Sequence, residues 1–355
     1  MKTETRSAFV GSRQFTYFTP KGRHPTEYED LTLHIQADPT IFALQGWLTR
    51  FADGRTPWTP ESTALRCTNW WEFQDPSKQW QRTYVATQAE QERGLDRIIG
   101  AAKTQGLFVE FDETWARTIL GKYYAAYAFV EYGLFRAFAF AQREALSATV
   151  GNVCIFNAAD KIRHAQDIVL YGMDLAEVIP GFSDAEAKAV WLADPLYQGA
   201  RKNVEGLMAS KDWGEVIIGV NLVLEPLFGV LARREFFSRF APRNGDAMTP
   251  AVLATVETDW QRNLQWTKAF VNVLLRDPEH GQGNKRVIEG WLGKWVPYTQ
   301  EAMQGLAPLF DVPTAKPHTF ARALERVEGQ YASLLEELGI QVPAPLAGEG
   351  QGKGT

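Results

Sequence analysis

Two five-residue stretches place charged and polar side chains at the spacing of a helical metal site. They are DKIRH at residues 160–164 and DWQRN at residues 259–263, and both read Asp-x-x-Arg followed by one more side chain. In helical bundles that bind two iron ions, each of two helices offers a Glu-x-x-His pair, and two further helices each add a Glu. The i, i+3 spacing puts the carboxylate and the imidazole on one face of a helix. This spacing is therefore typical of a di-iron centre.

The side chains at the ligand positions do not complete such a centre. When both stretches are aligned on Asp-Glu-x-Arg-His, a lysine and a tryptophan stand at the two Glu positions, and a histidine and an asparagine stand at the two His positions. A lysine ammonium has no lone pair, and an indole offers only a donor. We therefore expect no metal centre and no catalytic residue in this chain. The six positions that would hold ligands, including one glutamate from each of two apolar flanking segments, are Glu131, Lys161, His164, Glu225, Trp260 and Asn263.

The remaining ionisable groups at these positions also have an ordinary interpretation. His164 is expected to be a histidine of the core, with a weak adventitious metal ion as the alternative, because one imidazole without its carboxylate ligates poorly. Glu131 and Glu225 are expected to be buried acids that pair with a cation, and Lys161 and Arg136 are the available cations.

Helical periodicity runs almost without interruption from residue 81 to 310 and predicts an all-α protein built as a long-helix bundle. Residues 1–80 are rich in Pro, Gly and Thr and are interpreted as an irregular, extended N-terminal arm, which lies either over its own body or over a partner. Residues 311–340 are interpreted as a C-terminal helical extension, and the Gly- and Pro-rich residues 341–355 as a disordered tail. Helices are expected near 82–105, 112–144, 146–173, 183–192, 195–210, 212–240, 250–276, 284–309 and 318–338.

Helix starts are marked by capping residues, some of them followed by proline or by a glutamate three positions later. Pro226 removes a backbone donor inside an apparent helix, so we expect a kink or a widened turn beside Glu225. The expected N-cap residues are Ser183, Asp194, Asp212 and Thr249.

Composition excludes several classes of function. With 355 residues, of which 45% are hydrophobic, the chain can bury a large core. The net charge of -5 and the pI near 5.7 give no general attraction to nucleic acid or to anionic membrane surfaces. The apolar run 123–141 is long enough to span a bilayer, but it carries Glu131 and Arg136, so a buried helix is expected instead. The N-terminus lacks the apolar core of a signal peptide, and the two cysteines indicate no disulfide framework, so we expect a cytoplasmic protein.

Several longer stretches, taken together, resemble one known protein family. They are TNWWEFQDP at 68–76, NVCIFNAAD at 152–160, DWGE at 212–215 with NLVLEP at 221–226, and VIEGWLGKW at 287–295. With the two aligned stretches, they make most of the chain similar to the smaller, beta subunit of the hydroxylase in bacterial multicomponent, soluble di-iron monooxygenases. Residues 28–32, 36–39 and 45–47 look more like the propane and short-chain alkane branch than the aromatic branch.

This resemblance implies a ferritin-like fold and a non-catalytic role. In that family the alpha subunit carries the di-iron site, and the beta subunit is a degenerate relative of the same fold with no cofactor of its own. The implied partners are the alpha subunit, an effector protein, a reductase and, in some systems, a gamma subunit. The reductase passes electrons from NAD(P)H through a flavin and an iron–sulfur cluster, and the αβ or αβγ protomers dimerise. The N-terminal arm is expected to embrace the alpha subunit.

The resemblance also implies that four charged residues survive from a metal site. In the di-iron relatives, the positions of Asp160, Arg163, Asp259 and Arg262 hold the groups that orient the histidine ligands. We expect these residues to form a cross-braced polar network in place of the metal. In this network Asp160 pairs with Arg262, and Asp259 pairs with Arg163 or with His164.

Three other interpretations stay open at this point. The chain can be the beta subunit of an aromatic (toluene- or phenol-type) or alkene monooxygenase. It can be an independent metal or redox enzyme with an unusual mononuclear site around Glu131, Glu225 and His164. It can also be a free-standing helical scaffold with no oxygenase partner.

Overall fold

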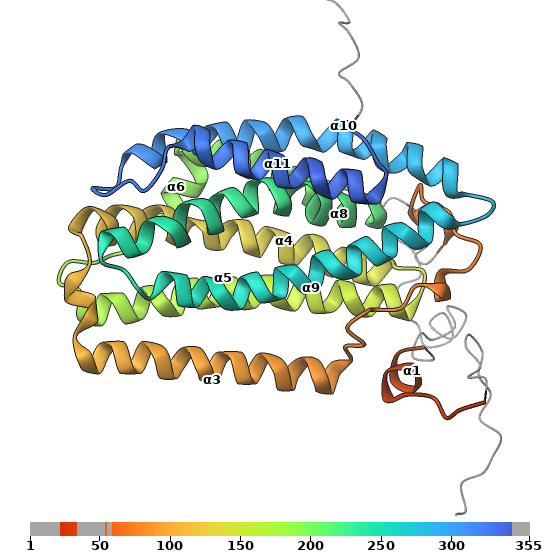
Figure 1. Ribbon diagram of the computed structural model, residues 1–355, viewed down its shortest axis with the longest axis horizontal. Coiled ribbons are helices and arrows are strands. Elements are labelled where there is room, and N and C mark those ends of the chain that lie inside the picture. The colour runs from red at the N-terminus through yellow and green to blue at the C-terminus, as the bar shows by residue number, and fades with distance from the viewer. Residues whose placement is uncertain (1–21, 34–53, 55–58, 343–355) are drawn as a thin grey trace, which may run out of the picture.

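The computed structural model describes residues 22–33, 54 and 59–342, and the regular elements of this part of the chain are all helical. Long helices lie side by side along the longest axis of the molecule (Figure 1). The predicted all-α, long-helix bundle is thereby confirmed. The α-helices are α1 (Glu27–Thr32), α3 (Gln81–Gln105), α4 (Ala125–Glu144), α5 (Ala148–Val178), α6 (Ala187–Ala193), α7 (Pro195–Ala209), α8 (Trp213–Ile218), α9 (Thr249–Arg276), α10 (Gly281–Gly305) and α11 (Phe320–Leu338).

Two further stretches have the wider hydrogen-bonding pattern of a π-helix. The first, η4 (Trp115–Tyr124), leads into α4, and the second, η5 (Gly219–Ser238), continues α8. Pro226 lies inside η5, so the widened turn predicted beside Glu225 is confirmed. The short 3₁₀ segments are η1 (Pro60–Ser62), η2 (Trp70–Glu72), η3 (Leu107–Glu110), η6 (Ala241–Asn244) and η7 (Ala307–Asp311).

Two of the predicted N-caps are confirmed and two are wrong. Asp194 and Asp212 accept hydrogen bonds from the first amides of α7 and α8, as predicted. Ser183 instead closes a turn, and α6 begins four residues later. Thr249 is the first residue of α9 and Met248 is its N-cap residue, and the buried Asp246 accepts with Oδ1 from the amides of both, at 2.8 and 2.9 Å. A carboxylate that reaches two free amides satisfies a helix start better than one hydroxyl.

Four helical segments form the centre of the bundle: α4, α5, η5 together with α8, and α9. Residues 145–147 join α4 to α5, and these two helices pack along their lengths. The segment η5 packs against α9, α10 and α11, and nearly all of its side chains are buried. Since each central segment presents one side to this shared interior, side chains from four distant parts of the sequence meet there.

The most apolar helix of the described part is the continuous run Trp213–Asn244. By length and composition it could cross a membrane, but its most apolar window lies entirely inside the bundle. The run 123–141 is likewise a helix of the interior, and its Glu131 is fully buried. Both runs are therefore core helices, as predicted for the second of them.

The described part of the N-terminal arm lies on its own bundle. The Ala64 amide donates to Asp212 at 2.6 Å, and the Arg66 amide donates to Asn284 at 2.9 Å. Residues 64 and 66 therefore lie against their own bundle, whereas whether the arm also covers a partner stays a prediction. The stretches 36–39 and 45–47, and all but the first two residues of the predicted tail, lie outside the described residues.

Candidate functional site

The six predicted ligand positions come together at the centre of the bundle. Glu131 lies on α4, Lys161 and His164 on α5, and Glu225 on η5. The positions on α9 are Trp260 and Asn263, and all six residues are buried. The widened turn of η5 contains Glu225 and carries its carboxylate to the same level as the others.

A compact cluster of four charges occupies this centre. The Lys161 ammonium lies 2.6 Å from Oε1 of Glu225 and 3.2 Å from Oε2 of Glu131. The Arg233 guanidinium pairs with Glu225 and lies 3.3 Å from Oε1 of Glu131. It also donates to the Tyr127 hydroxyl at 2.8 Å. Two carboxylates and two cations leave the cluster with no net charge.

Arg233 is the member of the cluster that sequence reasoning missed. Arg136, the predicted alternative cation, is exposed, so its expected pairing with a buried acid is wrong. The available signal was an arginine eight positions after Glu225 on a helix too apolar to carry an unpaired charge. A side chain at Gly229 would come within about 3 Å of both partners, at 2.9 Å from Oε2 of Glu225 and 3.0 Å from the Arg233 guanidinium. Glycine at this position therefore leaves room for the ion pair.

The cations set the charge state of the buried acids. Burial raises the pKa of Glu131, but its interactions with Lys161, His164 and Arg233 together outweigh burial and hold that pKa below its ordinary value. Glu225 behaves in the same way, with Arg233 as its strongest partner. Both acids are therefore carboxylates at neutral pH, and the ion pairs are real charges in the core.

His164 is the side chain in this centre with the least satisfied hydrogen-bonding capacity. Burial lowers its pKa, and the nearby Glu131 only partly offsets this effect, so the imidazole is neutral. Its Nδ1 lies 3.2 Å from Oε1 of Glu131 but lacks the geometry of a hydrogen bond. Its Nε2 has no hydrogen-bond partner within the described part of the chain.

The predicted cross-brace lies beside this cluster and joins α5 to α9. Arg262 on α9 lies 2.5 Å from Oδ2 of Asp160 on α5, and Arg163 on α5 lies 2.5 Å from Oδ2 of Asp259 on α9. Both pairings are as predicted, and the alternative of Asp259 with His164 is not the one formed. Arg262 also reaches Oδ1 of Asp259 at 2.9 Å, so the two pairs form one network.

Helix α3 adds two side chains to the cross-brace that sequence reasoning missed. The Tyr84 hydroxyl donates to Asp160 at 2.8 Å, and the Gln88 amide donates to Asp259 at 2.9 Å. The i, i+4 spacing of these two polar groups on a helix was the available signal. Asn263, at a predicted ligand position, also donates to Asp160, at 2.8 Å.

These donors do not fit a metal ion. Lys161 places its ammonium between Glu131 and Glu225, where a cation would have to lie, and Arg233 takes further oxygens of the same carboxylates. The space beside them measures about 10 Å³, on the order of a single water molecule. Within the residues that the structure describes, no group of three or more His, Cys, Asp or Glu side chains is placed to hold a metal.

The amino-acid sequence matches one known protein family. Residues 47–278 match the family described as methane, phenol and alkene hydroxylase. The chain belongs to this hydroxylase family.

Relatives within the family carry small-subunit names. The small subunit of the hydroxylase component of propane 2-monooxygenase from Rhodococcus jostii is 35% identical over 336 residues, which cover 94% of this chain and 91% of the relative. The beta chain of methane monooxygenase component A from Methylococcus capsulatus is 37% identical over 319 residues, covering 87% of this chain and 82% of the relative. These matches confirm the resemblance to a hydroxylase beta subunit and to its short-chain alkane branch.

The fold agrees with solved hydroxylase structures. Phenol hydroxylase from Pseudomonas sp. OX1 superposes with a TM-score of 0.75 at 20% sequence identity, covering 90% of this chain and 92% of that one. The ferritin-like character of the bundle is thereby confirmed. Members of this hydroxylase family therefore share the helical framework, and in this member an ion cluster lies at its centre.

Replacing Lys161 tests whether the four charges are balanced. Lys161→Met is expected to lower the free energy of unfolding by about 3–5 kcal/mol, because Glu131 and Glu225 are left with one cation in the core. Denaturant unfolding at neutral pH measures this change. The control Lys285→Met removes a half-exposed lysine that lies 3.9 Å from Glu289, and is expected to cost no more than about 1 kcal/mol. If both variants lost the same free energy of unfolding, the four buried charges would not be balanced as described.

The cross-brace and its neighbour Asp167 give stability a defined pH dependence. Burial raises the pKa of Asp160 to about 6 and that of Asp167 to about 7, from an ordinary 3.8. The folded chain therefore holds these protons more tightly than the unfolded chain does. Their contribution to stability is fully present below about pH 4 and is lost as the pH rises through about 6 and 7.

Asp167→Asn is expected to flatten this decline, because an amide does not ionise when the pH rises. The measurement is the free energy of unfolding in steps of pH for the natural chain and the variant. The exposed Glu328→Gln serves as the control and is expected to leave the slope unchanged. If the free energy of unfolding fell equally steeply with pH above about pH 5 in all three proteins, Asp167 would not be a source of the decline.

Proposed function

We propose that this chain is the non-catalytic small subunit of a multicomponent monooxygenase hydroxylase that oxidises short-chain alkanes of the propane type, with the di-iron centre in the partner large (alpha) subunit. The observation that carries the proposal is the position of Lys161 between Glu131 and Glu225, where a metal ion would otherwise lie. Relatives named as the small subunit of propane 2-monooxygenase match at 35% identity, whereas a relative named as the beta subunit of a toluene monooxygenase matches at 28%.

In the proposed complex the redox chemistry belongs to the other components. A reductase with a flavin and an iron–sulfur cluster delivers electrons from NAD(P)H, an effector protein controls access, and the large subunit activates O2. This chain supplies a rigid helical body that needs no metal to neutralise its polar centre. The αβ protomer, or αβγ where a gamma subunit is present, dimerises in the cytoplasm.

The proposal is tested by metal content and by assembly. The chain purified alone is expected to hold no stoichiometric iron, because the ammonium of Lys161 occupies the position of the ion. Co-expressed with the large subunit, it is expected to elute as a complex that contains iron. Elemental analysis and light scattering of the eluted species measure both properties. Stoichiometric iron in this chain, or a monomer that persists beside the large subunit, would overturn the proposal.

The N-terminal arm is proposed to strengthen that assembly. Deleting residues 1–60 is expected to weaken the complex with the large subunit, because the sequence of the arm carries aromatic residues of the kinds that are enriched at protein interfaces. Deleting residues 343–355 is the control and is expected to leave the affinity unchanged. Titration followed by size-exclusion chromatography compares the three chains. An unchanged affinity after the first deletion would show that the arm takes no part.

A further inference from the structure

A small polar cavity lies at the centre of the bundle, beside the four-charge cluster. Its volume is about 10 Å³, and its wall is made by side chains of α4, α5 and α9. All residues of this wall are buried except Arg163, which exposes 12% of its side chain. All of them except Val256 and Trp260 are polar or charged. The wall consists of Glu131, Asp160, Lys161, Arg163, His164, Val256, Asp259, Trp260 and Asn263.

The wall includes an imidazole whose two nitrogens form no hydrogen bond with the described part of the chain. His164 is only 1% exposed, and its Nδ1 lies 3.2 Å from Oε1 of Glu131 without the geometry of a hydrogen bond. Because the imidazole is neutral, one nitrogen carries a proton and the other is an acceptor. The carboxylate beside Nδ1 favours the proton on that nitrogen. Nε2 is then a buried acceptor that needs a donor.

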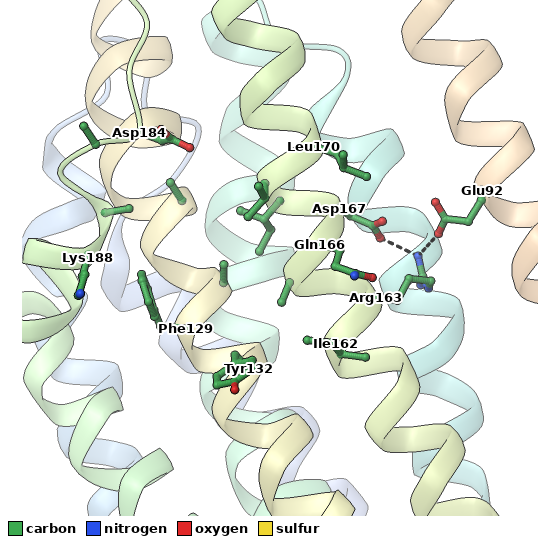
Figure 2. A pocket seen from close by; sticks show the side chains of 17 residues that line it. Glu92, Phe129, Tyr132, Ile162, Arg163, Gln166, Asp167, Leu170, Asp184 and Lys188 are labelled. Carbon is green, nitrogen blue, oxygen red and sulfur yellow. Dashed lines mark hydrogen bonds and ion pairs between the residues drawn. The ribbon is translucent and has the colours of Figure 1, made fainter.

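Two further groups of the wall also need partners. Oε2 of Glu131 accepts no hydrogen bond from the described residues. Arg163 uses Nη1 for Glu92 and Asp167, at 2.8 and 2.7 Å (Figure 2). Its Nη2 donates to Asp259 at 2.5 Å, whereas its Nε–H has no partner in the same part of the chain. With Nε2 of His164, the wall therefore contains two acceptors and one donor that the described residues leave unsatisfied.

A single water molecule matches these three groups. A buried polar group without a partner destabilises a fold, and nearly all such groups in folded proteins reach a protein atom or an ordered water. Water offers two donors and two lone pairs, so it can serve two acceptors and one donor at once. Internal waters make about three hydrogen bonds, and a cavity of about 10–15 Å³ holds one of them. The volume of this cavity is at that limit.

The charges around the cavity favour a neutral occupant over an ion. The central cluster pairs two carboxylates with two cations. The cross-brace likewise pairs two aspartates with two arginines. An added cation or anion would leave a net charge in the core, where an uncompensated charge is strongly destabilising. A cavity stays dry only where its wall is apolar, and this wall is not.

We propose that one water molecule is bound in this cavity as a fixed part of the fold. It donates to Nε2 of His164 and to Oε2 of Glu131, and it accepts from the Nε–H of Arg163. The centre of the bundle is then completed by internal cations, carboxylates and one water instead of a metal ion. The inference is independent of the proposed function, because every donor and acceptor belongs to this chain.

The first test counts the long-lived internal waters of the full-length chain. Magnetic relaxation dispersion of the solvent detects water molecules that stay in the protein longer than its tumbling time. His164→Phe is expected to lose one such water, because the larger ring removes the acceptor and extends into the small cavity. The control His280→Phe replaces a side chain that is 37% exposed and lies outside the cavity, and it is expected to keep the natural count. Melting temperatures show whether each variant folds.

The second test uses the natural chain and so does not depend on the folding of a variant. Nitrogen NMR of the chain labelled at its five histidines is expected to show His164 with its proton on Nδ1 and with Nε2 as a hydrogen-bonded acceptor. A high-resolution crystal structure is expected to show one water within about 2.7–3.2 Å of Nε2 of His164 and of Oε2 of Glu131.

Several results would overturn the inference. If folded His164→Phe kept the natural number of long-lived waters, none of them would be bound to His164. A proton on Nε2 of His164 would remove the acceptor on which the water depends. A high-resolution map without a feature in the cavity would show that the cavity is dry. Contacts of about 2.0–2.6 Å between an occupant and the carboxylates would identify a metal ion instead of water.

Discussion

The balance of four buried charges around Lys161 is the constraint on which the rest of the bundle depends. Each carboxylate of the cluster is fully enclosed, and the free energy of enclosing an isolated charge exceeds what any single helix contact supplies. The cluster is tolerable because Lys161 and Arg233 each contact both Glu131 and Glu225. Three central segments, α4, α5 and η5, are therefore fixed relative to one another by ion pairs whose partners lie on different segments. The relative placement of the helices follows from this requirement.

The cross-brace extends the same requirement to the fourth helix and to α3. Asp160 pairs with Arg262, and Asp259 pairs with both Arg163 and Arg262. Each aspartate also accepts a hydrogen bond from α3, through Tyr84 and Gln88 respectively. Helix α3 exposes much of its surface, and these two bonds position it together with the ion pair of Lys103 with Asp174 on α5. Arg163 pairs with Glu92 of α3 as well as with Asp259, so one guanidinium links α3 to the core network. The centre of the bundle and helix α3 are thus joined by one polar network.

Structural features that depend on one residue or on a few neighbouring residues could be predicted from the sequence. Helical periodicity located the long helices, two aspartates were correctly identified as caps, and Pro226 indicated the widened turn, because each effect acts within a few residues. The cross-brace was predictable for a different reason, namely its likeness to a motif whose geometry is known. Arg233 was missed because its partners lie on other helices or two turns away along a π-helix, where α-helical spacing does not apply. Sequence patterns likewise contain no information on which apolar face of α5 is left uncovered.

Helix α5 presents different side chains to the interior of the bundle and to its surface. Its inner side carries Asp160, Lys161 and His164 among apolar residues, whereas its outer side exposes Val169 and Leu170, so both sides mix polar and apolar groups. The inner charges are satisfied within the chain, so they contribute a rigid shape but offer nothing to a partner. The outer side chains are satisfied only when something covers them, and any partner that binds only the folded chain also stabilises it. A helix of this kind is held in position by its polar side and gains free energy from association through its apolar side.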